Sequence, residues 1–178
     1  MKRRLALDKN VATAQTRFMG LTDILGQEHI IPELRAADRW EAIDELVGIL
    51  VAAGKIKPDD RDCVAAVVKK REHSTSTGIG AGVAFPTAST NTIDTLAVAV
   101  GRSRKGIEFD SLDKQPVTLV MLVLVPAGQY PKYATLAQAL VKLFYSFPFR
   151  QAVENAADAE AICNLFGEHE RNLIPVEL

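Results

Sequence analysis

The sequence is poor in the residues that build disulfide frameworks and metal sites. Its two cysteines, Cys63 and Cys163, lie in distant segments that both have helical spacing. Such cysteines are typical of free, buried thiols in a protein of a reducing compartment. The three histidines have no ligand spacing with them: His29, His73 and His169. We therefore expect no metal site and no cofactor.

Long apolar runs and a strong net charge are also missing. The longest apolar run, 117–125 with Thr118 inside it, is about half the length that a membrane span needs. The first ten residues have a basic start, but no apolar segment of a signal peptide follows. A net charge of −1 gives no general attraction to nucleic acid or to an anionic membrane. These features predict a cytoplasmic protein without nucleic-acid or membrane partners.

Length and composition fit one folded domain. The chain has 178 residues, of which 48% are hydrophobic and 24% charged, as in ordinary globular proteins. We expect a flexible arm over residues 1–18, a domain over 19–170 and a tail over 171–178, because the basic and polar start has no sustained periodicity. Apolar runs that alternate with helical patterns predict an α/β sheet covered by helices on both faces.

Capping residues and apolar spacing locate the elements. Asp38 and Asp158 are expected helix N-caps, and Gly54 and Gly167 are expected helix ends. The pattern predicts helices over 38–54, 58–71, 131–144, 149–156 and 158–167. It predicts a short extended piece at 30–34, a strand over 93–100 and a central strand over 117–125. Residues 101–106, with Arg102, Arg104 and Lys105, have the composition of a solvated basic turn.

One stretch, KKREHSTSTGIGAGVAFPTAST over residues 69–90, has the composition of a binding site. Glycines at alternate positions let a backbone approach a ligand or another segment closely. Hydroxyl groups precede these glycines, and Arg71 offers a guanidinium suited to phosphate or carboxylate. The spacing fits neither the dinucleotide fingerprint nor the P-loop. We expect a site for an anion or a partner, formed by Arg71, Ser76, Thr77, Gly78, Gly80, Gly82 and Pro86.

The same stretch resembles the signature of the type-2 enzyme IIA domains of the bacterial phosphotransferase system (PTS), the fructose, mannitol and nitrogen-regulatory group. The matching residues are Arg71-Glu72, the run Ser76-Thr-Gly-Ile-Gly-Ala-Gly-Val-Ala84, and Phe85-Pro86. A second matching segment is Ile107-Glu-Phe-Asp110 with Leu112-Asp113. The resemblance extends over about residues 21–170 and implies a single domain with a mixed β-sheet between helices.

The resemblance breaks at two positions that matter for chemistry. The family has its phosphoacceptor histidine directly after the proline, where this chain has Thr87, and an assisting histidine where this chain has Tyr133. A threonine hydroxyl titrates far above neutral pH and attacks only with an adjacent base. Arg71 is expected either to compensate the helix end or to bind an anion, and Tyr133 either to fill the core or to line the pocket.

Two functions follow from this pattern. The first is a non-catalytic regulatory module, most similar to the stand-alone nitrogen-regulatory members. It would dock PTS proteins such as the histidine carrier protein, or a regulatory target, as a monomer or a homo-oligomer. The second is a phosphocarrier that uses another acceptor residue, or Thr87 itself with a dedicated kinase. A further possibility beside these two is a sensor whose hydroxyl pocket binds a small anion or metabolite. We favour the first, because the nucleophilic nitrogen is missing at both positions.

Overall fold

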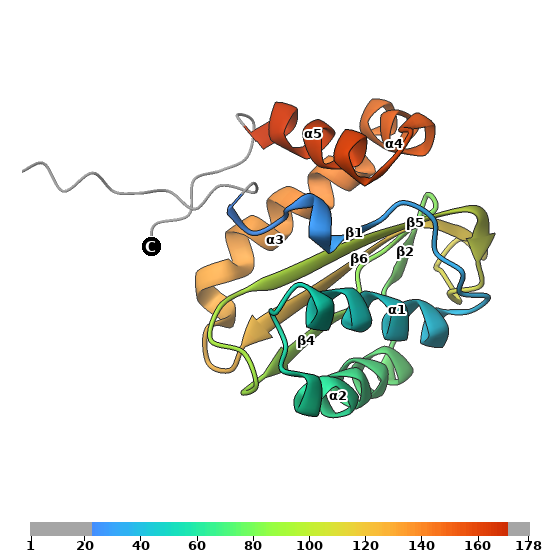
Figure 1. Cartoon of the computed structure of the whole chain (residues 1–178). Helices are drawn as coiled ribbons and strands as arrows, with labels where there is room; N and C mark the ends of the chain where they lie inside the picture. Colours follow the sequence, from blue (N-terminus) through green and yellow to red (C-terminus); the bar gives the residue numbers. More distant parts are fainter. Residues whose placement is uncertain (1–22, 171–178) are drawn as a thin grey trace, which may run out of the picture.

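A mixed sheet between two layers of helices dominates the computed structural model, which describes residues 23–170 (Figure 1). The predicted arm and tail lie outside the described residues. The elements in chain order are η2 (Gln27–His29), β1 (Ile30–Ile31), α1 (Arg39–Ala52), η3 (Pro58–Asp60), α2 (Arg61–Ser74), β2 (Gly78–Gly80), β3 (Val83–Ala84), β4 (Thr87–Thr90), β5 (Ala97–Ile107), β6 (Val117–Pro126), α3 (Tyr130–Tyr145), α4 (Phe147–Asn155) and α5 (Ala159–Glu170).

Strand β6 is the centre of the sheet, as its apolar run predicted. The strand order is β1-β5-β6-β3-β2, and β4 also pairs with β6, beyond the end of β3. β5 runs antiparallel to β6, whereas β3 and β4 run parallel to it. Every residue of β6 except Thr118 is buried. A strand covered on both faces needs such a continuous apolar sequence.

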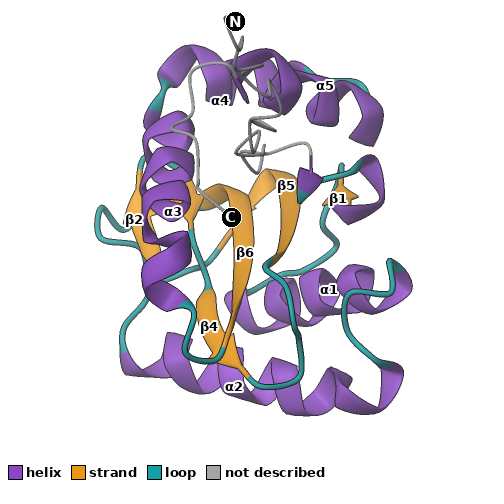
Figure 2. Ribbon diagram, turned by 90° about the vertical axis from the view of Figure 1, so that its left-hand side faces the viewer, coloured by secondary structure: helices purple, strands orange, loops and turns teal. Residues whose placement is uncertain are grey.

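The two faces of the sheet carry separate cores. Helices α1 and α2 cover one face, and α3, α4 and α5 cover the other (Figures 1 and 2). Neighbouring residues of a strand point to opposite faces. Met121 and Val123 accordingly join the core under α3, while Val120 and Leu122 join the core over α1 and α2. The predicted α/β fold with helices on both faces is confirmed.

Several predicted boundaries and exposures are confirmed, and others are wrong. Asp38 caps α1 by accepting hydrogen bonds from the backbone N–H groups of Trp40 and Glu41. Helix α2 continues to Ser74 and α5 to Glu170, each three residues beyond its predicted end. β4 was not predicted at all. Cys63 is exposed, because α2 turns the Val64 and Val68 stripe toward the core instead.

The basic turn predicted over residues 101–106 is also wrong. β5 begins at Ala97 and runs to Ile107, and its pairing with β6 continues at Arg102, opposite Leu119. The Arg102 side chain is 1% exposed. Its guanidinium donates to the carbonyl groups of Pro32, Val153, Glu154 and Ala156, at 2.7 to 3.3 Å. These carbonyls satisfy the buried cation, so a charged residue stands within the strand.

Gly78 provides a test of close packing. A Cβ atom there would lie 2.8 Å from the Cα atom of Ser111, whereas one on Gly48 in α1 would meet nothing within 4 Å. We expect Gly78→Ala to lower the free energy of unfolding by about 1–3 kcal/mol through overpacking. Gly48→Ala should raise it by up to about 1 kcal/mol through helix propensity. Urea unfolding checks both variants, and equal unfolding midpoints would contradict the close approach of Gly78 to Ser111.

His29 predicts a pH dependence of stability. It is buried, and its Nδ1 accepts a hydrogen bond from the Gly26 backbone N–H, 3.1 Å away. Burial lowers the His29 pKa below 6.5; Lys55 acts in the same direction, and Glu28 opposes it. The unfolded chain therefore takes up this proton first as the pH falls. Stability should be full above pH 6.5 and decline as the pH falls through 6.5 toward the folded-state pKa.

Thermal unfolding between about pH 7.5 and pH 5 measures this slope, and His29→Asn should flatten it because the buried titrating group is gone. An unchanged slope in the variant would assign the pH dependence to other groups.

Candidate functional site

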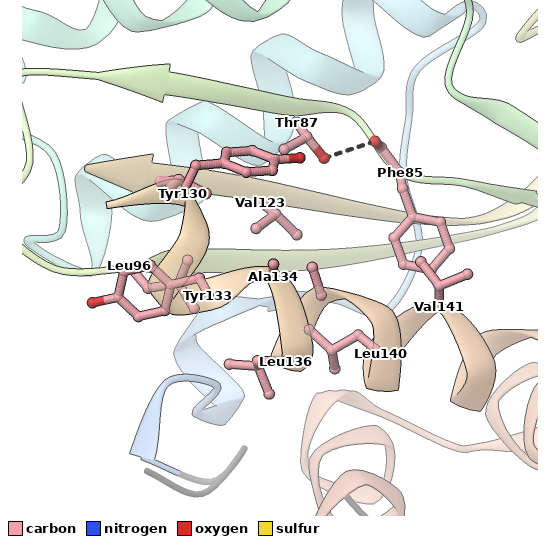
Figure 3. A pocket seen from close by; sticks show the side chains of 12 residues that line it. Phe85, Thr87, Leu96, Val123, Tyr130, Tyr133, Ala134, Leu136, Leu140 and Val141 are labelled. Atoms are coloured by element: carbon pink, nitrogen blue, oxygen red, sulfur yellow. Dashed lines mark hydrogen bonds between the residues drawn. The ribbon is translucent and has the colours of Figure 1, made fainter. Parts of the chain in front are cut away.

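Thr87 is placed by two short strands that run along the same side of β6. β3 and β4 both pair with β6 in parallel, and Phe85-Pro86 joins them. The Pro86 carbonyl accepts a hydrogen bond from the backbone N–H of Val123, which is also the register partner of Thr87. Thr87 is half-buried, and its hydroxyl donates to the Phe85 carbonyl oxygen at 3.0 Å (Figure 3). The position after the proline is therefore rigidly held.

A cavity of about 140 Å³ lies beside Thr87, between the sheet and α3 (Figure 3). Hydrocarbon dominates its wall, and the side-chain polar groups are three hydroxyls. We call it the apolar cavity, and its lining is Phe85, Thr87, Leu96, Val123, Val125, Tyr130, Tyr133, Ala134, Leu136, Ala137, Leu140 and Val141. A charged group would lose its hydration there without a partner in the wall.

A second hollow of about 280 Å³ adjoins the apolar cavity, since Phe85, Thr87 and Tyr130 line both. We call it the outer pocket. Its other lining residues are Val67, Arg71, Thr77, Ala88 and Ser89. Arg71 supplies the cation of this wall, and no carboxylate lies in it. The outer pocket is therefore suited to an anion.

Arg71 lies in the last turn of α2 and is exposed. Its Nη1 donates to the Thr75 carbonyl oxygen at 3.0 Å, which satisfies an acceptor beyond the helix end. Within residues 23–170 it forms no ion pair. Because a guanidinium has five N–H donors, this bond leaves donors for a ligand. Both predicted roles of Arg71 are therefore compatible with its position.

The hydroxyls and glycines of the signature mostly serve internal packing. Ser76 Oγ donates to the Phe109 carbonyl at 2.6 Å, and Thr77 donates its backbone N–H and its hydroxyl to the buried Glu72 carboxylate. The glycines pack against a neighbouring segment: Gly78 against Ser111, Gly80 against Asp113 and Gly82 against Thr118. Of the predicted site residues, Arg71, Thr77 and Thr87 meet at the outer pocket. Ser76, Gly78, Gly80, Gly82 and Pro86 do not line it.

Two tyrosines at the start of α3 have different positions. Tyr133 is 3% exposed and lines the apolar cavity, so it belongs to both the core and the pocket wall. Its hydroxyl lies 3.5 Å from Gln129 Oε1 and points away from Thr87 (Figure 3). Tyr130, which sequence reasoning missed, is 53% exposed and lines both hollows beside Thr87. Its place directly before Pro131, at a helix start, was the available signal.

No imidazole or carboxylate lines either hollow. His29 belongs to η2, His73 is exposed and lies against the Trp40 ring, and His169 lies against the Phe149 ring. Within the described residues, no helix is long and apolar enough to cross a membrane.

A mixed sheet between helical layers, with a pocket where two strands run beside β6, defines an α/β domain with a candidate site at the sheet edge. The family model of "Phosphoenolpyruvate-dependent sugar phosphotransferase system, EIIA 2" matches residues 23–169. The chain belongs to this family, as its signature predicted.

Characterised relatives support the assignment. The fructose-specific EIIA component of Haloferax volcanii is 31% identical over 153 residues, covering 84% of this chain and 98% of the relative. The nitrogen regulatory protein of Bradyrhizobium diazoefficiens is 28% identical, covering 81% of this chain and 92% of the relative. The fructose-specific EIIABC component of Bacillus subtilis is 31% identical over 86% of this chain, which spans 24% of that relative.

Solved structures share the fold. The nitrogen regulatory protein IIA-Ntr of Neisseria meningitidis superposes with a TM-score of 0.74 at 23% identity, over 82% of this chain and 97% of its own. The IIA mannitol structure of Escherichia coli gives a TM-score of 0.67 at 19% identity, over 80% and 98%.

The buried Glu72 carboxylate predicts a large stability effect next to the pocket. Glu72→Ala would leave the Thr77 N–H and hydroxyl without their acceptor, so we expect the free energy of unfolding to fall by about 3 kcal/mol. Asp62→Ala, which removes an exposed ion pair with Arg61 in the same helix, should cost less than about 1 kcal/mol. Urea unfolding measures the difference, and similar losses for both would disprove the role of Glu72.

Proposed function

We propose that this protein is a regulatory binding module of the nitrogen-regulatory type. It docks PTS proteins such as the histidine carrier protein, or a regulatory target, in the cytoplasm, and it does not relay phosphate through Thr87. The observation that carries the proposal is the pocket wall. The two hollows are lined by the hydroxyls of two threonines, one serine and two tyrosines, and among the lining residues there is no imidazole or carboxylate.

The absence of an imidazole among the lining residues matters because of the chemistry of phosphoryl relay. The resemblance implies transfer through a histidine nitrogen, which is a neutral nucleophile with a pKa near physiological pH. The Thr87 hydroxyl has no base beside it, and its proton is directed to the Phe85 carbonyl oxygen. A phosphate ester on threonine would also transfer its group poorly. We therefore propose that Thr87 and Tyr133 occupy the acceptor and assisting positions of the family without taking part in a phosphoryl relay.

Docking without relay is supported by the intact architecture around Thr87. The pairing of β3 and β4 with β6, and the bonds between Thr77 and Glu72, hold this surface. One chain in the complex of enzyme IIAMTL and phosphorylated enzyme IIBMTL from Escherichia coli shares the fold, at 18% identity and a TM-score of 0.67. We infer that this chain keeps a comparable surface for a PTS partner.

A phosphotransfer assay tests the proposal. The protein is incubated with phosphoenolpyruvate, enzyme I and the histidine carrier protein of its own organism, and its intact mass is read before and after mild acid. We expect no mass gain for the wild type. Thr87→His should gain one acid-labile phosphoryl group, because the imidazole restores a nitrogen nucleophile at a held position.

Thr75→His is the matched control, since it adds an imidazole at an exposed threonine outside both hollows. It should remain unmodified. An acid-labile gain in the wild type would overturn the proposal and direct attention to His29, His73 and His169 as acceptors. An acid-stable gain in the wild type would indicate phosphorylation of a hydroxyl, and would equally overturn it.

A further inference from the structure

We propose that the apolar cavity and the outer pocket together bind a small carboxylic acid with a compact apolar body, of about the size of phenylacetate. The apolar body would enter the cavity and the carboxylate would lie near Arg71. The inference rests on the proposed function, because a phosphoryl group on Thr87 would place a competing anion at the boundary of the two hollows.

The apolar cavity sets the size and character of the body. Its volume is about 140 Å³. An apolar cavity of about 150 Å³ is known to accept benzene, so one six-membered ring or a branched chain of similar size fits. The wall has no charged side chain. An apolar group can therefore enter without leaving a charged side chain buried and unpaired, whereas a charged or strongly hydrated ligand group would lose its hydration.

The outer pocket determines the charge of the ligand's head group. Arg71 is its cation, no acidic residue lines it, and Ser89 adds a hydroxyl that can donate to an anion. A guanidinium binds a carboxylate through two parallel hydrogen bonds, which a neutral amide cannot reproduce. The nearby N-terminus of α3 adds to this preference, because Gln129 provides no side-chain cap and the first turn has no acidic residue.

The two hollows form one site because they share part of their wall. Phe85, Thr87 and Tyr130 line both, so they mark the boundary between apolar body and anionic head. The Tyr130 phenol lies beside Thr87 at this boundary (Figure 3). A ligand whose carboxylate is one or two bonds from its ring can place the ring in the apolar cavity and the carboxylate in the outer pocket. Acetate would occupy the outer pocket alone, and a neutral ring the cavity alone.

Isothermal titration calorimetry of the full chain with phenylacetate tests the inference, with phenylacetamide and acetate as probes of the separate halves. We expect saturable one-to-one binding of phenylacetate with a dissociation constant below about 1 mM, which is within the affinity open to a ligand of about ten non-hydrogen atoms. The amide and acetate should each bind at least about tenfold more weakly. Equal binding of acid and amide, or no saturation by phenylacetate, would overturn the inference.

Variants test separately whether the outer pocket binds the carboxylate and whether the apolar cavity binds the apolar body. Arg71→Gln should weaken phenylacetate binding about tenfold or more. Lys70→Gln makes the same charge change at the adjacent exposed position, outside both hollows, and should leave it within about twofold. Ala137→Leu should fill the cavity and abolish binding without changing the thermal midpoint by more than a few degrees. Equal effects of Arg71→Gln and Lys70→Gln would overturn the assignment of the head group.

The two assays test the two proposals separately. If phenylacetate does not bind and the wild type gains no phosphoryl group, only the carboxylic-acid site is refuted. If the wild type gains mass in the phosphotransfer assay, the regulatory module is refuted even when phenylacetate binds.

Discussion

The buried guanidinium of Arg102 ties the sheet to helix α4 and to the segment that follows β1. It extends from the middle of the sheet and donates to the Pro32 carbonyl, beyond β1, and to three carbonyls at the end of α4. The last carbonyls of a helix lack partners and carry partial negative charge, so a cation is favourable there. This contact fixes α4, and through the Phe144, Phe149 and Phe166 cluster it fixes α3 and α5 over the sheet. The wall of the apolar cavity formed by α3 therefore depends on a strand residue far from it.

The signature stretch shows a second constraint, the close approach of two segments. Its glycines allow the backbone to lie against residues 111–118, and its hydroxyls bond to Phe109 and Glu72. A sequence rich in Gly, Ser and Thr therefore needs no ligand to explain it here. Six residues of the stretch line the outer pocket, and Tyr130 joins them from α3. The six are Arg71, Thr77, Phe85, Thr87, Ala88 and Ser89.

The parts that could be predicted from sequence are those governed by local rules. β6 follows from its continuous apolar run, and α1 from the Asp38 cap. The second half of β5 could not be predicted, because Arg102 is buried only through carbonyls supplied by distant segments. β4 has the sequence Thr-Ala-Ser-Thr, with little apolar character, and exists because β6 offers it a pairing edge. The pocket likewise depends on α3 packing over the sheet, so Tyr130 had no signal beyond its place at a helix start.

The side chain at position 87 determines the chemistry of the pocket, whereas the backbone sets its frame. The backbone at Thr87 is held by the pairing of β4 with β6, which does not depend on the side chain. The wall also contains the Arg71 guanidinium, a cation whose fork of N–H donors suits an anionic group. Such a wall suits an anion, but a hydroxyl does not exchange a proton near neutral pH as an imidazole does. A cation in a wall without an imidazole is the physical reason to propose a binding function.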